Sequence, residues 1–148
     1  MQEEYLEKLI ATDYKLITIE TAATKETIRD FTAMVREGKA IYAWKEDEGL
    51  YRLEASHIYI PKTKTPEMIL KHIQKSKHYG VYLLVDFQQY ISEPKLYNLA
   101  KQISDDKKSN KTIIFINNFS NYSPSLLEIL LITQEVDVKK STLFTELF

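Results

Sequence analysis

Polar side chains that could serve a nucleotide stand at three points of the chain, each near the end of an apolar run. Lys25 comes shortly after the run at 15–20, Asp86 ends the run at 81–85, and Asn117 follows the run at 112–116. A lysine can neutralise phosphate oxygens, an aspartate can hold Mg²⁺, and a polar amide can sense the terminal phosphate. If the three runs are strands of one sheet, these residue types suggest a small nucleotide-binding or phosphotransfer enzyme with an atypical site.

The elements that must position these residues alternate along the chain between apolar runs and amphipathic segments. We expect strands at 15–20, 40–44, 81–85, 112–116 and 135–138, and extra short strands or a loop at 45–63. We expect helices at 3–12, from Thr24 to Gly38, from Thr65 and Pro66, from Ser92, and from Ser123 and Pro124. Strands separated by helices require crossover connections and a parallel sheet covered on both faces. The prediction is an α/β three-layer sandwich with a five-stranded, mainly parallel sheet, whose ligands would bind outside the strand carboxyl ends.

The segment after the first expected strand departs from a phosphate-binding loop. Residues 20–27 read ETAATKET, whereas the loop pattern is G-x-x-x-x-G-K-[ST], and the glycines of this chain stand only at 38, 49 and 80. Glycine lets successive amides curl around phosphate oxygens. Glu26 stands where a magnesium-binding hydroxyl belongs, and a carboxylate about 4 Å from a phosphate opposes it by ~4 kcal/mol at an effective dielectric near 20. We therefore expect this loop to repel a triphosphate.

Asp86 and Asn117 also have ordinary structural interpretations. Phe87 follows Asp86, so no second acid stands there to orient an attacking water. We expect the Asp86 carboxylate to cap backbone amides or to pair with a lysine. Asn117 and Asn118 are typical turn formers, because asparagine bonds its own backbone and tolerates left-handed φ.

Composition restricts the function classes further. The 148 residues include 20 Lys plus Arg against 21 Asp plus Glu, and no cysteine. A net charge of -1 gives no general attraction for nucleic acid, and the missing cysteines exclude disulfides and thiolate metal sites. His57, His72 and His78 lie in different contexts, so we expect no metal site. No apolar stretch approaches the ~20 residues of a membrane span, and the acidic start MQEEY is unlike a secretory signal. We expect one cytoplasmic domain over 1–148.

Tyrosine is abundant, with ten residues, and the single tryptophan, Trp44, stands beside the polar segment KEDEGLY. Tyrosine and tryptophan are enriched at protein interfaces, since they bury a large area and keep a polar tip. We therefore expect the segment 44–51 to form a contact surface with a protein partner.

Several stretches together resemble a known family. They are YLEKLIATDYKLITIETA, IYAWKEDEGL, VYLLVDFQQYISEPKLYNLAKQI, KTIIFINN and SPSLLEILLITQEVDV. In this order the sequence resembles the N-terminal region of the AAA+ ATPases of the chloroplast open-reading-frame type, from cyanobacteria and algal plastids. The match falls on residues with no catalytic role in the family: Tyr42, Trp44, Gly49, Leu50, Asp86 and Phe87. It departs at SPSLLE, where the proline and the acid stand in a different register.

The resemblance implies a degenerate AAA+ or P-loop-NTPase-like fold without a phosphate loop or a cofactor of its own. ATP and Mg²⁺ would bind a downstream AAA+ module, into which the tail VDVKKSTLFTELF would lead, so the chain would be part of a longer protein. That parent would hydrolyse ATP in the cyanobacterial cytosol or plastid stroma, and the chain could oligomerise through it.

Three functions from different classes follow from these observations. The first is a non-catalytic N-terminal domain that recruits a partner or substrate, or packs on the ATPase ring. Its expected contact residues are Tyr42, Trp44, Gly49, Leu50, Tyr51 and Phe87. The alternative is the enzyme that uses Lys25, Asp86 and Asn117. A nucleic-acid-binding domain ranks last, because of the net charge.

Overall fold

The structure is a computed structural model that describes residues 3–11, 14–21, 23–35, 40–106, 108 and 110–117. Three predictions lie outside these residues: the helix end at Gly38, the helix from Ser123 and Pro124, and the strand at 135–138.

One six-stranded sheet organises the described residues. Its order is β1-β6-β5-β2-β3-β4, and its strands are β1 (Leu16–Glu20), β2 (Ile41–Lys45), β3 (Gly49–Arg52), β4 (Tyr59–Ile60), β5 (Gly80–Val85) and β6 (Lys111–Asn117). The pairs β1–β6, β6–β5 and β5–β2 are parallel, whereas β2–β3 and β3–β4 are antiparallel. The predicted α/β class and mainly parallel sheet are confirmed. The predicted strands at 15–20, 40–44, 81–85 and 112–116 are confirmed, and the extra short strands allowed at 45–63 are present as β3 and β4, so the sheet of the described residues has six strands.

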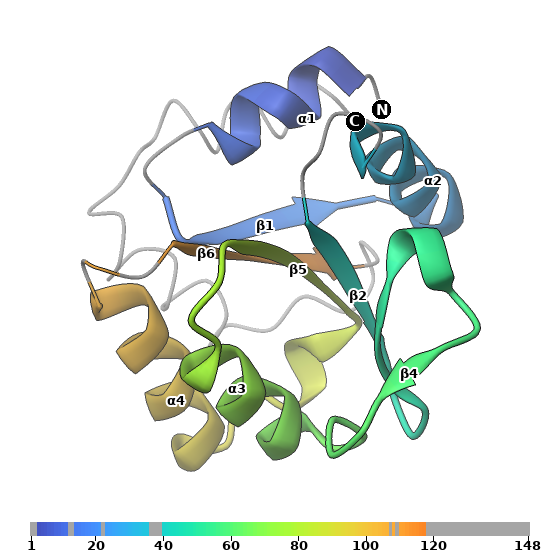
Figure 1. Cartoon of the computed structure of the whole chain (residues 1–148). Coiled ribbons are helices and arrows are strands. Elements are labelled where there is room, and N and C mark those ends of the chain that lie inside the picture. The colour runs from blue at the N-terminus through green and yellow to red at the C-terminus, as the bar shows by residue number, and fades with distance from the viewer. Residues whose placement is uncertain are drawn as a thin grey trace.

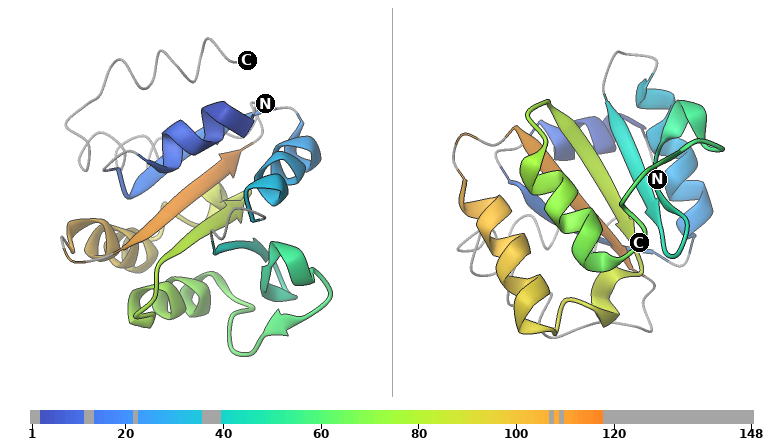
Figure 2. Two further views of the ribbon diagram at one scale, coloured as in Figure 1. Left: turned by 45° about the horizontal axis from the view of Figure 1, so that its top comes forward. Right: turned by 60° about the horizontal axis from the view of Figure 1, so that its bottom comes forward.

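Helices cover both faces of the sheet and make three layers (Figure 1). α1 (Glu3–Ile10) and α2 (Thr24–Val35) lie on one face, and α3 (Pro66–Lys75) and α4 (Pro94–Asp105) lie on the other, as Figure 2 also shows. Alternate strand residues serve the two faces, as the pleat requires. Ile17, Ile19, Val81, Leu83, Ile114 and Ile116 pack with α1 and α2, and Leu16, Tyr82, Leu84, Ile113 and Phe115 pack with α3 and α4.

The start of α3 follows the predicted chemistry, whereas the start of α4 does not. The hydroxyl of Thr65 accepts a hydrogen bond of 3.2 Å from the Met68 amide, and Pro66 is the first helical residue. We expected the next helix to begin from Ser92, but α4 begins at Pro94. Proline disfavours helical backbone at the preceding residue, and Glu93 is extended at φ -73° and ψ 127°. The short 3₁₀ helix η2 (Phe87–Gln89) and a turn occupy the interval.

Candidate functional site

The strand ends that we expected to meet lie at one edge of the sheet. The Thr21 amide donates to the Asn117 carbonyl at 2.9 Å, and the Asp86 amide donates to the Ile116 carbonyl at 3.0 Å. The neighbouring strands β1 and β6 are connected over opposite faces of the sheet, since α2 follows β1 on one face and α4 precedes β6 on the other. Ligands of open α/β sheets bind at such a switch point. The carboxyl ends of β1 and β6 are therefore the candidate site.

Two polar side chains near this switch point, Thr18 and Asn117, are buried without a partner among the described residues. Asn117 is 0% exposed, and in the described part of the chain neither its amide oxygen nor its amide nitrogen has a hydrogen-bond partner. The hydroxyl of Thr18 is buried in the same way. Thr18 pairs with Phe115, so Thr18 and Asn117 are diagonal neighbours on one face of the sheet. The expectation that Asn117 forms a turn is wrong, because the strand β6 continues through it.

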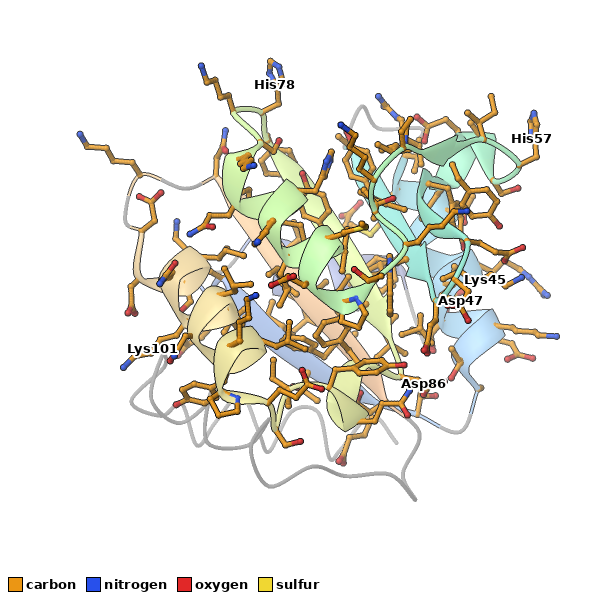
Figure 3. All side chains as sticks on the ribbon, turned by 90° about the horizontal axis from the view of Figure 1, so that it is seen from below. Lys45, Asp47, His57, His78, Asp86 and Lys101 are labelled. Atoms are coloured by element: carbon orange, nitrogen blue, oxygen red, sulfur yellow. The ribbon has the colours of Figure 1, made fainter. Side chains whose placement is uncertain are left out.

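Asp86 lies exposed at this edge (Figure 3). Its backbone is left-handed at φ 54° and ψ 37°, a conformation that aspartate adopts more readily than most residues. Among the described residues its carboxylate makes neither a cap hydrogen bond nor an ion pair, so the expected cap or lysine contact is wrong. Asp86 and Asn117 share the sheet edge, but one side chain is exposed and the other is buried.

In the loop after β1, the backbone amide and carbonyl of Ala23 are both hydrogen-bonded within the chain. The Ala23 amide donates to the hydroxyl of Thr21 at 2.9 Å, and the Ala23 carbonyl accepts from the Thr27 amide at 3.0 Å. Lys25 is exposed in the first turn of α2, beside Glu26. Burial raises the pKa of Glu20 at the end of β1. No hydrogen bond or ion pair joins Lys25 to Asp86 or Asn117 among the described residues.

The hairpin of β2 and β3 borders the same edge and is fixed by the side chain of Thr63. The Trp44 Nε1 donates to the Thr63 carbonyl at 2.7 Å, and the Leu50 amide donates to the Thr63 hydroxyl at 2.8 Å. That hydroxyl donates in turn to the Ile60 carbonyl at 2.6 Å. Gly49 has φ 117°, and a Cβ there would lie 2.8 Å from the Thr63 hydroxyl oxygen. This network holds the turn at 46–48 in place.

The six expected contact residues occupy two kinds of position. Trp44, Gly49, Leu50 and Phe87 are buried, whereas Tyr42 and Tyr51 are half-buried. The rings of Trp44 and Phe87 meet edge to face at 5.5 Å between centroids. Their role toward a partner stays a prediction. The four buried residues would act by supporting the exposed turn.

The surface expected at 44–51 includes this turn but not Tyr59 and Tyr90, which bind it. Glu46 accepts a hydrogen bond from the Tyr90 hydroxyl, and Glu48 is bound by the Tyr59 hydroxyl at 3.3 Å and by Lys45 at 2.8 Å. Burial, the bond to Glu46 and the charges of Asp47 and Glu93 raise the pKa of Tyr90 to about 12. The run of three acids at 46–48 was the available signal, but Tyr90 lies far from it in sequence.

Two kinds of feature are absent from the part of the chain that the structure describes. No group of three His, Asp or Glu side chains there is arranged to hold a metal ion. No helix in those ranges has both the length and the apolar character needed to cross a bilayer.

A family model described as the N-terminal domain of SpoVK-like AAA ATPases matches residues 1–135. The chain belongs to this family. Neither a curated protein nor a solved structure matches the chain. The predicted kinship with AAA+ ATPase N-terminal domains is confirmed for this SpoVK-like domain, and the cyanobacterial or plastid type stays a prediction.

Proposed function

We propose that this SpoVK-like domain is non-catalytic and serves its parent AAA+ ATPase by recruiting a protein partner or substrate, or by packing on the ATPase ring. ATP and Mg²⁺ would bind the downstream module. The parent would work in the cytoplasm, either the cyanobacterial cytosol or the plastid stroma. Membership in an N-terminal domain family supports the accessory role.

The observation that carries the non-catalytic part is the state of the loop between β1 and α2. A phosphate loop offers free backbone amides, but here the Ala23 amide is bound by the Thr21 hydroxyl. Glu20 and Glu26 place carboxylates on either side of the loop, and residues 20–27 contain no glycine. Each feature opposes a polyphosphate and so supports the proposal that this domain holds no nucleotide.

The recruitment part is supported by the hairpin of β2 and β3. Its turn exposes Glu46, Asp47 and Glu48, while Trp44 and Leu50 are buried beneath it. Loops that a rigid scaffold holds in place carry binding functions more often than the scaffold itself. The half-buried rings of Tyr42 in β2 and Tyr51 in β3, on opposite faces of the sheet, offer apolar area with polar tips.

Titration calorimetry with Mg-ATP tests the non-catalytic part directly. We expect no saturable heat from the 148-residue chain, and no change on Lys25→Ala. Micromolar binding that Lys25→Ala removes would overturn the proposal. A turnover that Asp86→Asn abolishes without loss of the fold would favour the phosphotransfer enzyme instead.

The two accessory roles separate in the full-length parent with the turn 46–48 changed to Gly-Asn-Gly. Recruitment predicts that ring assembly and basal ATP hydrolysis persist while stimulation by the partner or substrate falls. Packing on the ring predicts that assembly or basal hydrolysis falls as well. A parent unchanged in all these measurements would contradict both roles for the hairpin.

A further inference from the structure

Opposite charges gather at the two ends of the strands, although the chain as a whole is nearly neutral. At the carboxyl ends lies a group that we call the acidic end, formed by Glu46, Asp47, Glu48, Asp86 and Glu93, all exposed. Lys45 and Lys64 lie beside it, the latter through a hydrogen bond of 3.3 Å from the Asp47 amide to its carbonyl. Glu20, Glu26 and Glu67, and Lys25, Lys62 and Lys95, also lie after the strand ends or at the starts of α2, α3 and α4, so among the described residues eight acids face five lysines at this end.

The amino ends of the strands carry the opposite balance. We call basic end the lysines that surround the starts of β1, β5 and β6: Lys15, Lys75, Lys77, Lys108 and Lys111. The Lys111 ammonium donates to the Gln74 carbonyl at 3.0 Å, and Lys15 donates to the Asp106 carbonyl at 2.9 Å, which places these elements together. Among the described residues, five lysines here face the acids Asp105 and Asp106, and Arg52 and Glu54 pair with each other where β3 ends beside β2.

The two ends lie on opposite sides of the domain. Figure 3 shows His78 before β5 and Asp86 after it at opposite ends of that strand. Six strand residues span about 20 Å at ~3.3 Å each, more than the Debye length of about 8 Å at physiological salt. The charges of one end are therefore screened from those of the other within a single copy.

Much of this charge is not used inside the domain. Among the described residues, Asp47, Asp86, Lys75 and Lys77 make no ion pair within 4 Å. Charge that is neither paired internally nor neutralised by its neighbours is available to a complementary surface.

We propose that copies of this chain associate head to tail, the acidic end of one copy against the basic end of the next. A two-fold symmetric contact through either end would set like charges against each other, which costs free energy. A head-to-tail contact instead leaves one free end on each copy, and such contacts close into rings or extend as filaments. The association goes beyond the accessory role proposed above and does not depend on it.

Two double variants test the contact with the 148-residue chain. Glu48→Lys with Glu93→Lys reverses the acidic end, and Lys75→Glu with Lys77→Glu reverses the basic end. Sedimentation velocity should show wild-type mass rising with concentration at about 0.05 M salt and falling to the monomer at about 1 M. Each variant alone should associate about tenfold more weakly or not at all, since like charges then meet.

Mixing the two variants gives the decisive result. One is basic at both ends and the other acidic at both, so an equimolar mixture should recover association that neither shows alone. Arg29→Glu with Lys71→Glu is the control, because it makes the same charge change on exposed faces of α2 and α3. The control should associate like the wild type, and circular dichroism should report a folded domain for every variant.

Three results would overturn the proposal. They are a wild type that stays monomeric up to about 1 mM at low salt, association that persists unchanged at high salt, and a mixture of folded variants that does not associate. A monomeric result would leave the accessory role standing, because that role is measured by nucleotide binding and by the parent's activity.

Discussion

Two regions at the same edge of the sheet differ in whether their buried polar groups are hydrogen-bonded. In the hairpin of β2 and β3, Thr63 accepts one hydrogen bond and donates another, and its carbonyl accepts a third from Trp44. At the switch point, Thr18 and Asn117 are buried with no side-chain partner in the described residues. A buried polar group without a partner costs about 1–3 kcal/mol. The hairpin is thus stabilised by its hydrogen bonds. The unpaired groups at the switch point, where ligands of such sheets usually bind, instead lower the free energy of unfolding.

This difference shows that one region of the edge holds its polar groups in fixed hydrogen bonds and the other does not. The switch point keeps polar side chains but has no free amide at Ala23 to hold a phosphate. The hairpin gains a fixed backbone and an exposed acidic turn. Substitutions that disturb one region or the other test the contrast.

The largest expected effect is at Gly49. Gly49→Ala places a Cβ at a position 2.8 Å from the Thr63 hydroxyl oxygen and imposes φ 117° on a residue with a side chain. We expect a loss of about 2–4 kcal/mol in the free energy of unfolding, from backbone strain and a displaced hydrogen bond. Urea unfolding followed by circular dichroism measures it. Glu48→Ala, at the exposed neighbour, should cost far less, and equal losses would show that Gly49 is not the constraint.

A somewhat smaller loss is expected from Thr63→Val. The substitution keeps the shape but removes the hydroxyl that the Leu50 amide and the Ile60 carbonyl use. We expect a loss of about 1–3 kcal/mol, because the buried Leu50 amide loses its partner. Thr63→Ser retains the hydroxyl and should recover most of that loss in the same urea experiment. A serine variant as unstable as the valine variant would assign the effect to packing.

The same substitution at Thr18 should have the opposite sign. Thr18 is 4% exposed and its hydroxyl has no partner among the described residues, so Thr18→Val removes a buried polar group without breaking a bond. We expect a gain of up to about 1 kcal/mol by urea unfolding. A loss as large as that at Thr63 would mean that the hydroxyl is bonded in solution, and the contrast between the two regions would fail.

The contrast also marks how far the sequence alone could lead. Buried runs such as 112–116 and the cap at Thr65 depend on neighbouring residues, so they could be predicted from local pattern. The burial of Trp44 depends on Thr63, which is 19 residues away, and no local pattern carries that contact. The start of α4 at Pro94 rather than Ser92 also follows from a local rule, since the residue before proline resists helix. The prediction of a turn at Asn117 fails because the strand β6 extends beyond the apolar run 112–116 and includes Asn117.

The smallest expected effect is at Glu20, beside the switch point, where burial raises the pKa of the carboxyl above its ordinary value of 4.5. The folded state then holds a proton that the unfolded state has already lost. The contribution of Glu20 to the free energy of unfolding therefore falls as pH rises from about 4.5 through the raised pKa. At pH 7 the buried carboxylate is ionised, and its full destabilising effect is present. Glu20→Gln removes this cost, so the variant should be more stable than the wild type at pH 7 by less than about 1 kcal/mol.

That gain should shrink as the pH falls below about 4.5, where both states of the wild type are protonated. Thermal melts at a series of pH values measure the difference. Glu26→Gln is the matched control, because Glu26 is exposed in the first turn of α2, where its charge interacts favourably with the helix dipole. This control should be neutral or slightly less stable at pH 7. If Glu20→Gln behaved in the same way, the carboxylate of Glu20 would be solvated or paired, and the switch point would tolerate negative charge without cost.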